Sequence, residues 1–295
     1  MNRVLIFGGL GNQMFQHALN IALNKKGKKT KILFSNLFYE EHHSGFNLAY
    51  AFNLPLGFPL NVYNFLLLNA DFLYKPRLPK SILRRLINSY LKKKYTSYKE
   101  LKEFVYDEEV FKQDSKLFIG IWQVEEYFKD IESAIKEQFT FRRPKDSLNI
   151  ALAERIQNTE SISIHIRRGD YLQSEWLESH LVIKGIDYYN KALDYINRNI
   201  QNPTFYIFSD NIGWAQNHLK IKNAVYINHN SGKNSCFDMY LMSLCKHNII
   251  ANSTFSWWGA WLNKNKNKIV LMPEKWLNTK DCGGIFPDNW IKITV

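Results

Sequence analysis

The sequence lacks the features that place a chain in a membrane or in an oxidising compartment. No apolar run reaches the roughly 18 residues that a transmembrane helix needs, and the first residues read as a strand and a turn rather than a signal peptide. Only three cysteines occur in 295 residues. Cys236 and Cys245 are expected on opposite faces of one helix, so no disulfide framework is implied. We therefore expect a reducing, cytoplasmic setting.

Several catalytic and ligand-binding signatures are missing as well. The sequence has no Asp-x-Asp pair, no His-Glu-x-x-His and no cysteine cluster, which leaves little to hold a divalent cation. It has no Gly-x-Ser-x-Gly elbow, so a serine hydrolase is not indicated. No helix-turn-helix, RNA-binding or zinc-knuckle signature accompanies the positive charge, which argues against a nucleic-acid partner. We expect neither a metal nor another cofactor.

What the sequence does contain is enough apolar material for two packed domains. Hydrophobic residues make up 45% and aromatic residues 15% of the chain, and this length fits two cores of about 150 residues each. The basic, proline-containing run at 142–145 is typical of a linker. We predict an N-terminal domain at 1–145 and a C-terminal domain at 146–295.

Much of the formal net charge of +12 lies between Lys75 and Lys102. Apolar residues recur there at helical spacing, which favours an amphipathic helix. A solvated helix on a basic protein is the plainer interpretation. The alternative is a surface that meets acidic lipid head groups, which would place the protein peripherally at the inner membrane.

Short apolar strands alternate with helical segments along most of the chain. This order predicts a parallel α/β sheet in each domain. The predicted strands are 4–7, 30–34, 117–122, 161–166, 204–208, 224–227, 248–251 and 268–272. The predicted helices include 124–139, 187–200, 237–244 and 255–262. Ligands of such sheets bind beyond the carboxyl ends of the strands, where Arg167, Ser209 and Asn252 lie.

Two turns have the composition of a polar ligand site. Gly8 to Asn12 joins the first strand to a helix, and its glycines allow backbone N–H groups to approach a ligand. It is no dinucleotide fingerprint, because Met14 replaces the third glycine. The second turn, Asn252 to Ser256, opens a helix with hydroxyl side chains. These residues are ordinary helix caps, and the same arrangement is also suited to a phosphate.

The stretch Ile162 to Tyr171 places two adjacent arginines where a strand ends. Ile162, Ile164 and Ile166 alternate, so one strand face is expected to pack inward, with His165 and Arg167 on the other. An arginine fork holds two oxygens of a phosphate or carboxylate. The plainer alternative is a surface ion pair between an arginine and Asp170, which contributes about 0–1 kcal/mol.

Four blocks together resemble the bacterial α-1,2-fucosyltransferases, glycosyltransferase family 11. They are GGLGNQMFQ at 8–16, HIRRGDY at 165–171, FSD at 208–210 and NSTFSWWG at 252–259. The arginine block alone is shared with α-1,6- and protein O-fucosyltransferases. The first turn and the Ser-Trp-Trp-Gly block select the α-1,2 group.

The resemblance implies two Rossmann-like domains facing a cleft, the GT-B type. It implies metal-independent, inverting transfer of L-fucose from GDP-fucose to the 2-hydroxyl of a terminal β-galactoside, on an acceptor that the basic segment suggests is lipid-linked. Arg167 is expected on the diphosphate, with Asn12 and Asp170 as further catalytic candidates. The expected donor pocket comprises Gly11, His165, Arg168, Ser209, Asp210, Asn252, Ser253, Thr254 and Ser256, with Asp238 on the guanine or ribose.

Other assignments stay open from the sequence. The general base is Asp170, Glu175 or Glu178, or none if the leaving group departs early. A fucosyltransferase of another linkage, such as α-1,6, would share the arginine block. A non-catalytic protein that binds a nucleotide sugar or a glycan would share the same pocket without turnover.

Overall fold

The computed structural model describes residues 1–34, 47–54, 89 and 96–295, apart from the side chains of Asp170, Ser174 and Glu175. The described chain divides into two compact units, Met1–Arg142 and Arg143–Val295. The sequence placed the boundary at 145/146. Most of the basic segment Lys75–Lys102, including the part where the amphipathic helix is expected, lies outside the described residues, and its described end contains a strand at Thr96–Lys99.

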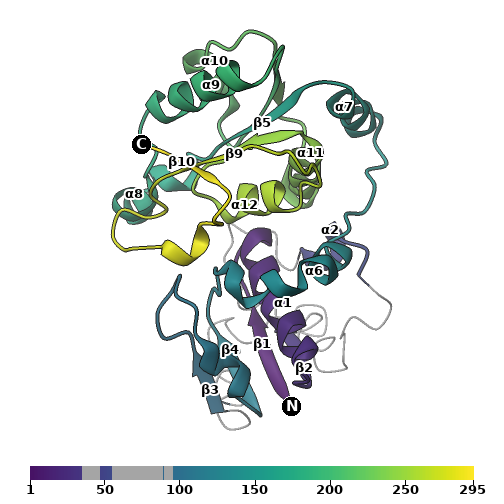
Figure 1. Ribbon diagram of the computed structural model, residues 1–295, viewed down its shortest axis with the longest axis vertical. Coiled ribbons are helices and arrows are strands. Elements are labelled where there is room, and N and C mark those ends of the chain that lie inside the picture. Colours follow the sequence, from purple (N-terminus) through teal and green to yellow (C-terminus); the bar gives the residue numbers. More distant parts are fainter. Residues whose placement is uncertain (35–46, 55–88, 90–95) are drawn as a thin grey trace, which may run out of the picture. The chain divides into compact units, whose positions relative to one another are not determined.

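The N-terminal unit is built on a four-stranded sheet in the order β2-β1-β4-β3, with every pairing parallel (Figure 1). The strands are β1 (Asn2–Ile6), β2 (Thr30–Phe34), β3 (Thr96–Lys99) and β4 (Lys116–Ile119). The described helices are α1 (Leu10–Lys25), α2 (Leu48–Ala51) and α6 (Glu132–Gln138), with 3-10 turns η2 (Glu108–Lys112), η3 (Glu125–Tyr127) and η4 (Lys129–Ile131). Helix α1 buries its apolar stripe, including Met14, Phe15 and Leu19, against this sheet.

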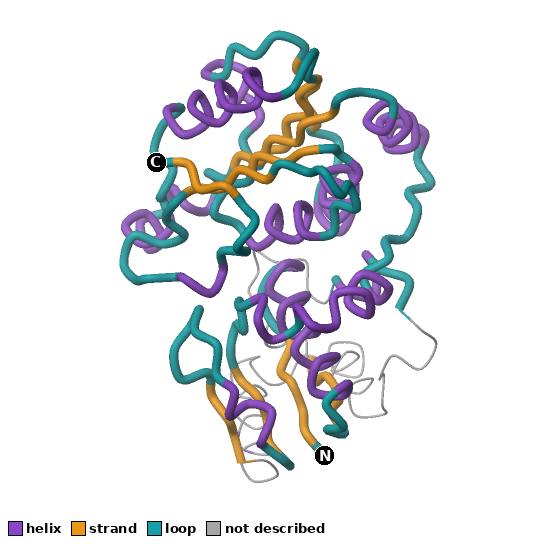
Figure 2. The backbone as a smooth tube through the Cα atoms, in the orientation of Figure 1, coloured by secondary structure: helices purple, strands orange, loops and turns teal. Residues whose placement is uncertain are grey.

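The C-terminal unit has a six-stranded parallel sheet in the order β10-β9-β8-β5-β6-β7. Figure 2 draws the strands in orange. Its strands are β5 (Ser161–Ile166), β6 (Thr204–Ser209), β7 (Ala224–Ile227), β8 (His247–Ile249), β9 (Val270–Pro273) and β10 (Ile291–Ile293). Its helices are α7 (Ser147–Gln157), α8 (Ser174–His180), α9 (Asp187–Asn199), α10 (Ile212–His218), α11 (Cys236–Leu244) and α12 (Thr254–Trp261), with 3-10 turns η5 (Asp170–Leu172), η6 (Gly232–Ser235) and η7 (Gly283–Ile285).

Strand β5 is buried on both faces, so the expectation of one packed face is wrong. Ile162, Ile164 and Ile166 pack into a core shared with helices α9 and α10. On β6, alternate residues enter that core and a second core shared with α7 and α11. Helices on both faces of a parallel sheet leave no solvated side. The polar residues of β5, Ser163 and His165, are therefore buried too.

The predicted α/β class with two Rossmann-like units is confirmed, and two local predictions are wrong. The segment 124–139 is not one helix, because the backbone at Phe128 leaves the helical region (φ −140°, ψ 2°) and only Glu132–Gln138 is α-helical. Strand β4 ends at Ile119, before Trp122 adopts a left-handed φ of 55°. Helix α7 and strand β10 were not predicted.

Candidate functional site

The candidate site is built at the carboxyl edge of the C-terminal sheet. Strands β5 and β6 pair in register, with Ile166 opposite Ser209. The residues that follow them, Arg167 and Asp210, therefore emerge side by side. Parallel α/β sheets bind their ligands at this edge.

At this edge, Asp210 contacts both adjacent arginines. One of its carboxylate oxygens, Oδ2, lies 3.1 Å from Nη1 of Arg167, and the other accepts the backbone N–H of Arg168 at 2.9 Å. The side chains of Arg167 and Asp210 are 30% and 22% exposed, so the pair is accessible yet partly shielded from water. Asp210 was predicted to contact the donor; in this structure it orients Arg167.

Gly169 lies against the same carboxylate. A Cβ atom at this position would lie 3.0 Å from Oδ2 and 3.2 Å from Cγ of Asp210. A side chain at 169 would therefore require the Asp210 carboxylate to shift by a few tenths of an ångström.

Arg168 points its guanidinium away from Asp210, toward helix α10. Its Cζ lies 4.2 Å from the centre of the Trp214 ring, and Nη1 donates to the carbonyl oxygen of Lys184 at 3.0 Å. Cation–π stacking and this hydrogen bond fix the side chain. The two adjacent arginines thus have different surroundings, and only Arg167 is paired with Asp210.

His165 and Ser256 form a buried pair under the site. Nδ1 of His165 lies 2.8 Å from Oγ of Ser256, and the two residues are 6% and 1% exposed. Burial, helped by the charge of Arg167, lowers the pKa of His165 to about 3. The imidazole is therefore neutral at pH 7. Both were predicted in the donor pocket; here they join β5 to α12.

The turn before α12 is tied down by its own polar groups. Asn252 is 3% exposed, and its amide donates to the carbonyl oxygens of His180 at 2.9 Å and Trp276 at 3.0 Å. Ser253 caps the helix by accepting the N–H of Phe255 at 3.3 Å. Thr254 is the first helical residue. The turn has the geometry of a helix cap, and phosphate binding there remains a prediction.

The loop after β5 is anchored by an aromatic residue that the sequence did not single out. The hydroxyl of Tyr171 donates to the carbonyl oxygen of Asn252 at 2.9 Å, and its ring lies 5.7 Å from the Cζ of Arg167. The side chains of Asp170 and Glu175, two candidates for the general base, lie outside the described residues. The third, Glu178, is exposed on α8.

Ser209 and Asp238 complete the predicted donor residues of this unit. The Ser209 hydroxyl accepts the N–H of Asn211 at 2.9 Å. Asp238 lies in the first turn of α11, and its Oδ1 accepts a hydrogen bond from Asn230 at 2.7 Å. Burial raises the pKa of Asp238 to about 7, and the Asn230 bond opposes the rise. A carboxyl that titrates near neutrality at a ligand edge is a candidate site residue.

The glycine turn of the N-terminal unit is held by buried amides. Gln13 donates to the carbonyl oxygen of Gly8 at 2.8 Å, and Gln16 accepts the N–H of Phe7 at 2.9 Å. Gly8 has a φ of 75°, a region that glycine adopts without strain. Asn12, with Gly11 before it, opens helix α1, and Oδ1 of Asn12 accepts a hydrogen bond from Gln123 at 3.0 Å.

Two expectations concern absent features. Among the described residues, no group of three or more His, Cys, Asp or Glu side chains could hold a metal ion. Metal independence remains a prediction. In the same part of the chain, no helix is both long enough and apolar enough to cross a bilayer.

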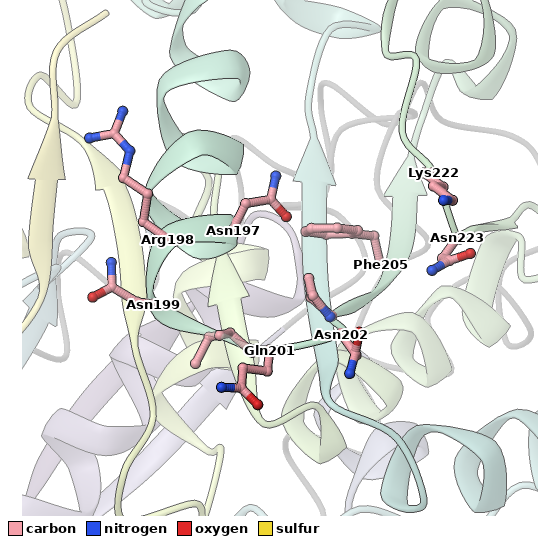
Figure 3. Close-up of a pocket in the computed structure, with 10 residues that line it drawn as sticks. Asn197, Arg198, Asn199, Gln201, Asn202, Phe205, Lys222 and Asn223 are labelled. Carbon is pink, nitrogen blue, oxygen red and sulfur yellow. The ribbon is translucent and has the colours of Figure 1, made fainter.

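A separate hollow of about 580 Å³ lies at the opposite, amino edge of the C-terminal sheet. Figure 3 shows the side chains around it, most of them amides and two of them cations: Asn197, Arg198, Asn199, Gln201, Asn202, Lys222 and Asn223. None of the predicted site residues lines it. We place the functional site at the carboxyl edge, where the Arg167–Asp210 pair lies.

Comparison with known proteins gives the family. The family described as "Glycosyl transferase family 11" matches residues 1–294. The O-antigen biosynthesis glycosyltransferase WbnK of Escherichia coli is 30% identical, over 97% of this chain and 98% of that protein. An alpha-1,2-colitosyltransferase of Escherichia coli is 32% identical, over 97% of this chain and 96% of its own.

Among solved structures, the fucosyltransferase NodZ from Bradyrhizobium matches with a TM-score of 0.49 and 14% identity, covering 87% of this chain and 91% of that one. The family match over nearly the whole length, with the sequence blocks and the two parallel α/β units, shows that the chain belongs to glycosyltransferase family 11.

Proposed function

We propose that the protein transfers L-fucose from GDP-fucose to the 2-hydroxyl of a terminal β-galactoside, with inversion and without a metal ion. The observation that carries this proposal is Arg167 beside Asp210 at the carboxyl edge of the sheet. A guanidinium with a fixed orientation and partial exposure is suited to two oxygens of a diphosphate.

Arg167 supplies the main catalytic effect in this proposal. GDP-fucose is β-linked and the product α-linked, so the acceptor hydroxyl attacks the face opposite GDP. Negative charge grows on the diphosphate as the sugar acquires oxocarbenium character. An arginine already aimed at that charge binds the transition state more tightly than the ground state. Asp210 is the positioning residue that aims it.

His165 does not transfer a proton in this proposal. Its imidazole is neutral at pH 7 because its pKa is lowered to about 3, and Nδ1 is engaged with Ser256. A neutral ring beneath Arg167 adds no second positive charge under the diphosphate. The base that accepts the acceptor proton is Asp170, Glu175 or Glu178, or the step proceeds without one.

The donor sugar has a second candidate. A relative of 32% identity is named an alpha-1,2-colitosyltransferase, and colitose differs from fucose by the lack of its 3-hydroxyl group. The α-1,2 linkage is common to both donor assignments. The alternatives from the sequence are α-1,6 transfer and binding without turnover.

The proposed acceptor is a galactose-terminated oligosaccharide. We extend this proposal to an oligosaccharide carried on a lipid at the inner membrane.

The test is an assay with defined donors and acceptor. The purified protein is incubated with GDP-fucose or GDP-colitose and lactose, with and without EDTA, and GDP release and product mass are followed. We expect fucosyl-lactose in equal amounts with and without EDTA, and an α-1,2 linkage by NMR. Transfer only from GDP-colitose would reassign the donor, loss of transfer in EDTA would refute metal independence, and GDP binding without any turnover would support a binding protein.

A further inference from the structure

A chain of hydrogen-bonded side chains leads from helix α7 to Asp238. Asn149 donates through Nδ2 to Oδ2 of Asp146 at 3.0 Å and to Oδ1 of Asn230 at 2.8 Å. Asn230 donates through its own Nδ2 to Oδ1 of Asn149 at 3.0 Å and to Oδ1 of Asp238 at 2.7 Å. Two carboxylates are thus joined through a pair of reciprocal amides, which we call the amide relay (Asp146, Asn149, Asn230 and Asp238).

The chemistry of the two ends fixes the orientation of both amides. An ionised carboxylate only accepts hydrogen bonds, so each amide must turn its NH2 group toward its carboxylate. Oδ1 of Asn149 also lies 3.0 Å from Nε2 of His229, which makes that nitrogen the donor. Asn149 is 1% exposed and has every donor and acceptor of its side chain engaged. A flipped amide would set oxygen against oxygen in a buried place.

The relay acts on a carboxyl group at the ligand edge. Asn230 follows the carboxyl end of β7, and Asp238 is in the first turn of the next helix, α11. Asn230 holds Oδ1 of Asp238, while no described residue bonds Oδ2. A hydrogen bond to the charged form of a carboxyl stabilises that form. The relay therefore orients Asp238 and favours its ionised form, opposing the rise in pKa that burial causes.

We propose that Asn149 and Asn230 are positioning residues that set nucleobase selectivity, by presenting Asp238 as an ionised acceptor to the ring N–H and the exocyclic amino group of guanine. The inference rests on the proposed use of a GDP-sugar. Hypoxanthine keeps the ring N–H and lacks the amino group, and adenine has no N–H at that ring position. A carboxylate held in one orientation accepts from both guanine donors, whereas a protonated or rotated carboxyl does not.

Three ionisable groups lie near Asp238 or contact Asn149 of the amide relay, and they bear on any pH readout. Cys236 is on the same helix, and burial with the Asp238 charge raises its pKa to about 12, so it stays a thiol. Asp146, at the start of α7, has its pKa lowered by the hydrogen bonds from Asn149, so it stays ionised. His229 bonds Asn149, and a His229→Gln variant removes the imidazole while keeping an N–H donor.

The experiment measures dissociation constants of GDP, IDP and ADP by calorimetry between pH 5.5 and 9. The variants are Asn230→Ala and Asn230→Asp; the second keeps the side-chain shape and replaces the donor by an acceptor. Asn158→Ala is the matched control, because Asn158 is an exposed amide at the end of α7 and, among the described residues, its Nδ2 bonds only the carbonyl oxygen of Glu154. Thermal unfolding establishes that each variant is folded.

We expect the native protein and Asn158→Ala to favour GDP over IDP by roughly 10-fold or more, the value of one hydrogen bond to a charged group. In both Asn230 variants the preference should fall to a few-fold. The pH below which GDP affinity is lost should move upward, most in Asn230→Asp, and should not move in His229→Gln. One contrary result is a folded Asn230→Asp variant that keeps the native preference for GDP over IDP and loses GDP affinity at the native pH. That result would overturn the inference about the amide relay and leave the donor assignment intact. Failure of the native protein to bind GDP would overturn the donor assignment as well.

Discussion

The two sheets of this protein present different chemistry at their carboxyl edges. The C-terminal edge carries an ion pair between Arg167 and Asp210. The N-terminal edge carries amides, and the contact described there joins Gln123 to Asn12. A charged edge is suited to a diphosphate, whereas neutral amides are suited to sugar hydroxyls. The difference agrees with the proposed division into a donor domain and an acceptor domain, and each prediction below tests it.

The largest effect is expected from Arg167→Ala. Loss of one preorganised contact to developing charge reduces the rate by about 10²–10³-fold, and kcat should fall more than the affinity for GDP. Arg167→Lys should recover little, because an ammonium group lacks the two-pronged geometry. Steady-state kinetics with the donor varied measures both. Retention of most of the activity in Arg167→Ala would refute the assignment.

A smaller effect is expected from Asp210→Asn. The new amide oxygen can still accept the N–H of Arg168, and the NH2 group then faces the guanidinium of Arg167, donor against donor. Loss of a charge-assisted hydrogen bond costs about 1.5–3 kcal/mol of interaction free energy, so kcat/KM should fall about 10- to 100-fold. An Arg198→Ala variant, altered at the amino edge of the same sheet, is the control and should retain native kinetics.

At the N-terminal edge, Asn12→Ala should affect the acceptor rather than the donor. Loss of one neutral hydrogen bond weakens binding by about 0.5–1.5 kcal/mol, so KM for lactose should rise a few-fold to about 10-fold. The dissociation constant of GDP, measured by calorimetry, should stay at the native value. A large loss of GDP affinity in this variant would remove the contrast between the two edges.

A further effect is expected on stability, and both units share it. Burial lowers the pKa of His17 and of His165 to about 3, below the ordinary value near 6.5 of the unfolded chain. The unfolded state therefore binds more protons below pH 6.5, and the free energy of unfolding should decline as the pH falls toward 3. Urea unfolding at pH 7.5, 6 and 4.5 measures this. His17→Gln and His165→Gln should each flatten the decline, and an unchanged slope in both would contradict it.

Local pattern in the sequence was sufficient for five of the six strands of the C-terminal sheet, all except β10. The strands at 161–166 and 224–227 have the predicted bounds, because runs of β-branched and aromatic residues encode a buried strand locally. Strand β3, with the sequence TSYK, carries no such run. The helix expected at 124–139 failed because non-local packing fixes the backbone around Trp122 and Phe128, both of which are buried.

The candidate site was only partly predictable, for a related reason. The sequence placed Arg167 and Asp210 at strand ends, and the pairing of β5 with β6 decides that they touch. Asn149 shows the limit most clearly, since it resembles any polar residue in the first turn of a helix. Its partner Asn230 lies 81 residues further along the chain. No local pattern contains a contact of that separation.

Gly169 has a consequence for the engineering of this chain. A Cβ at 169 would lie 3.0 Å from Oδ2 of Asp210, so a side chain there requires the carboxylate to shift by a few tenths of an ångström. Because the same carboxylate pairs with Arg167, the shift would reach the guanidinium. Substitutions at 167, 169 and 210 should therefore be non-additive, and a library that varies the three positions together samples combinations that single substitutions miss.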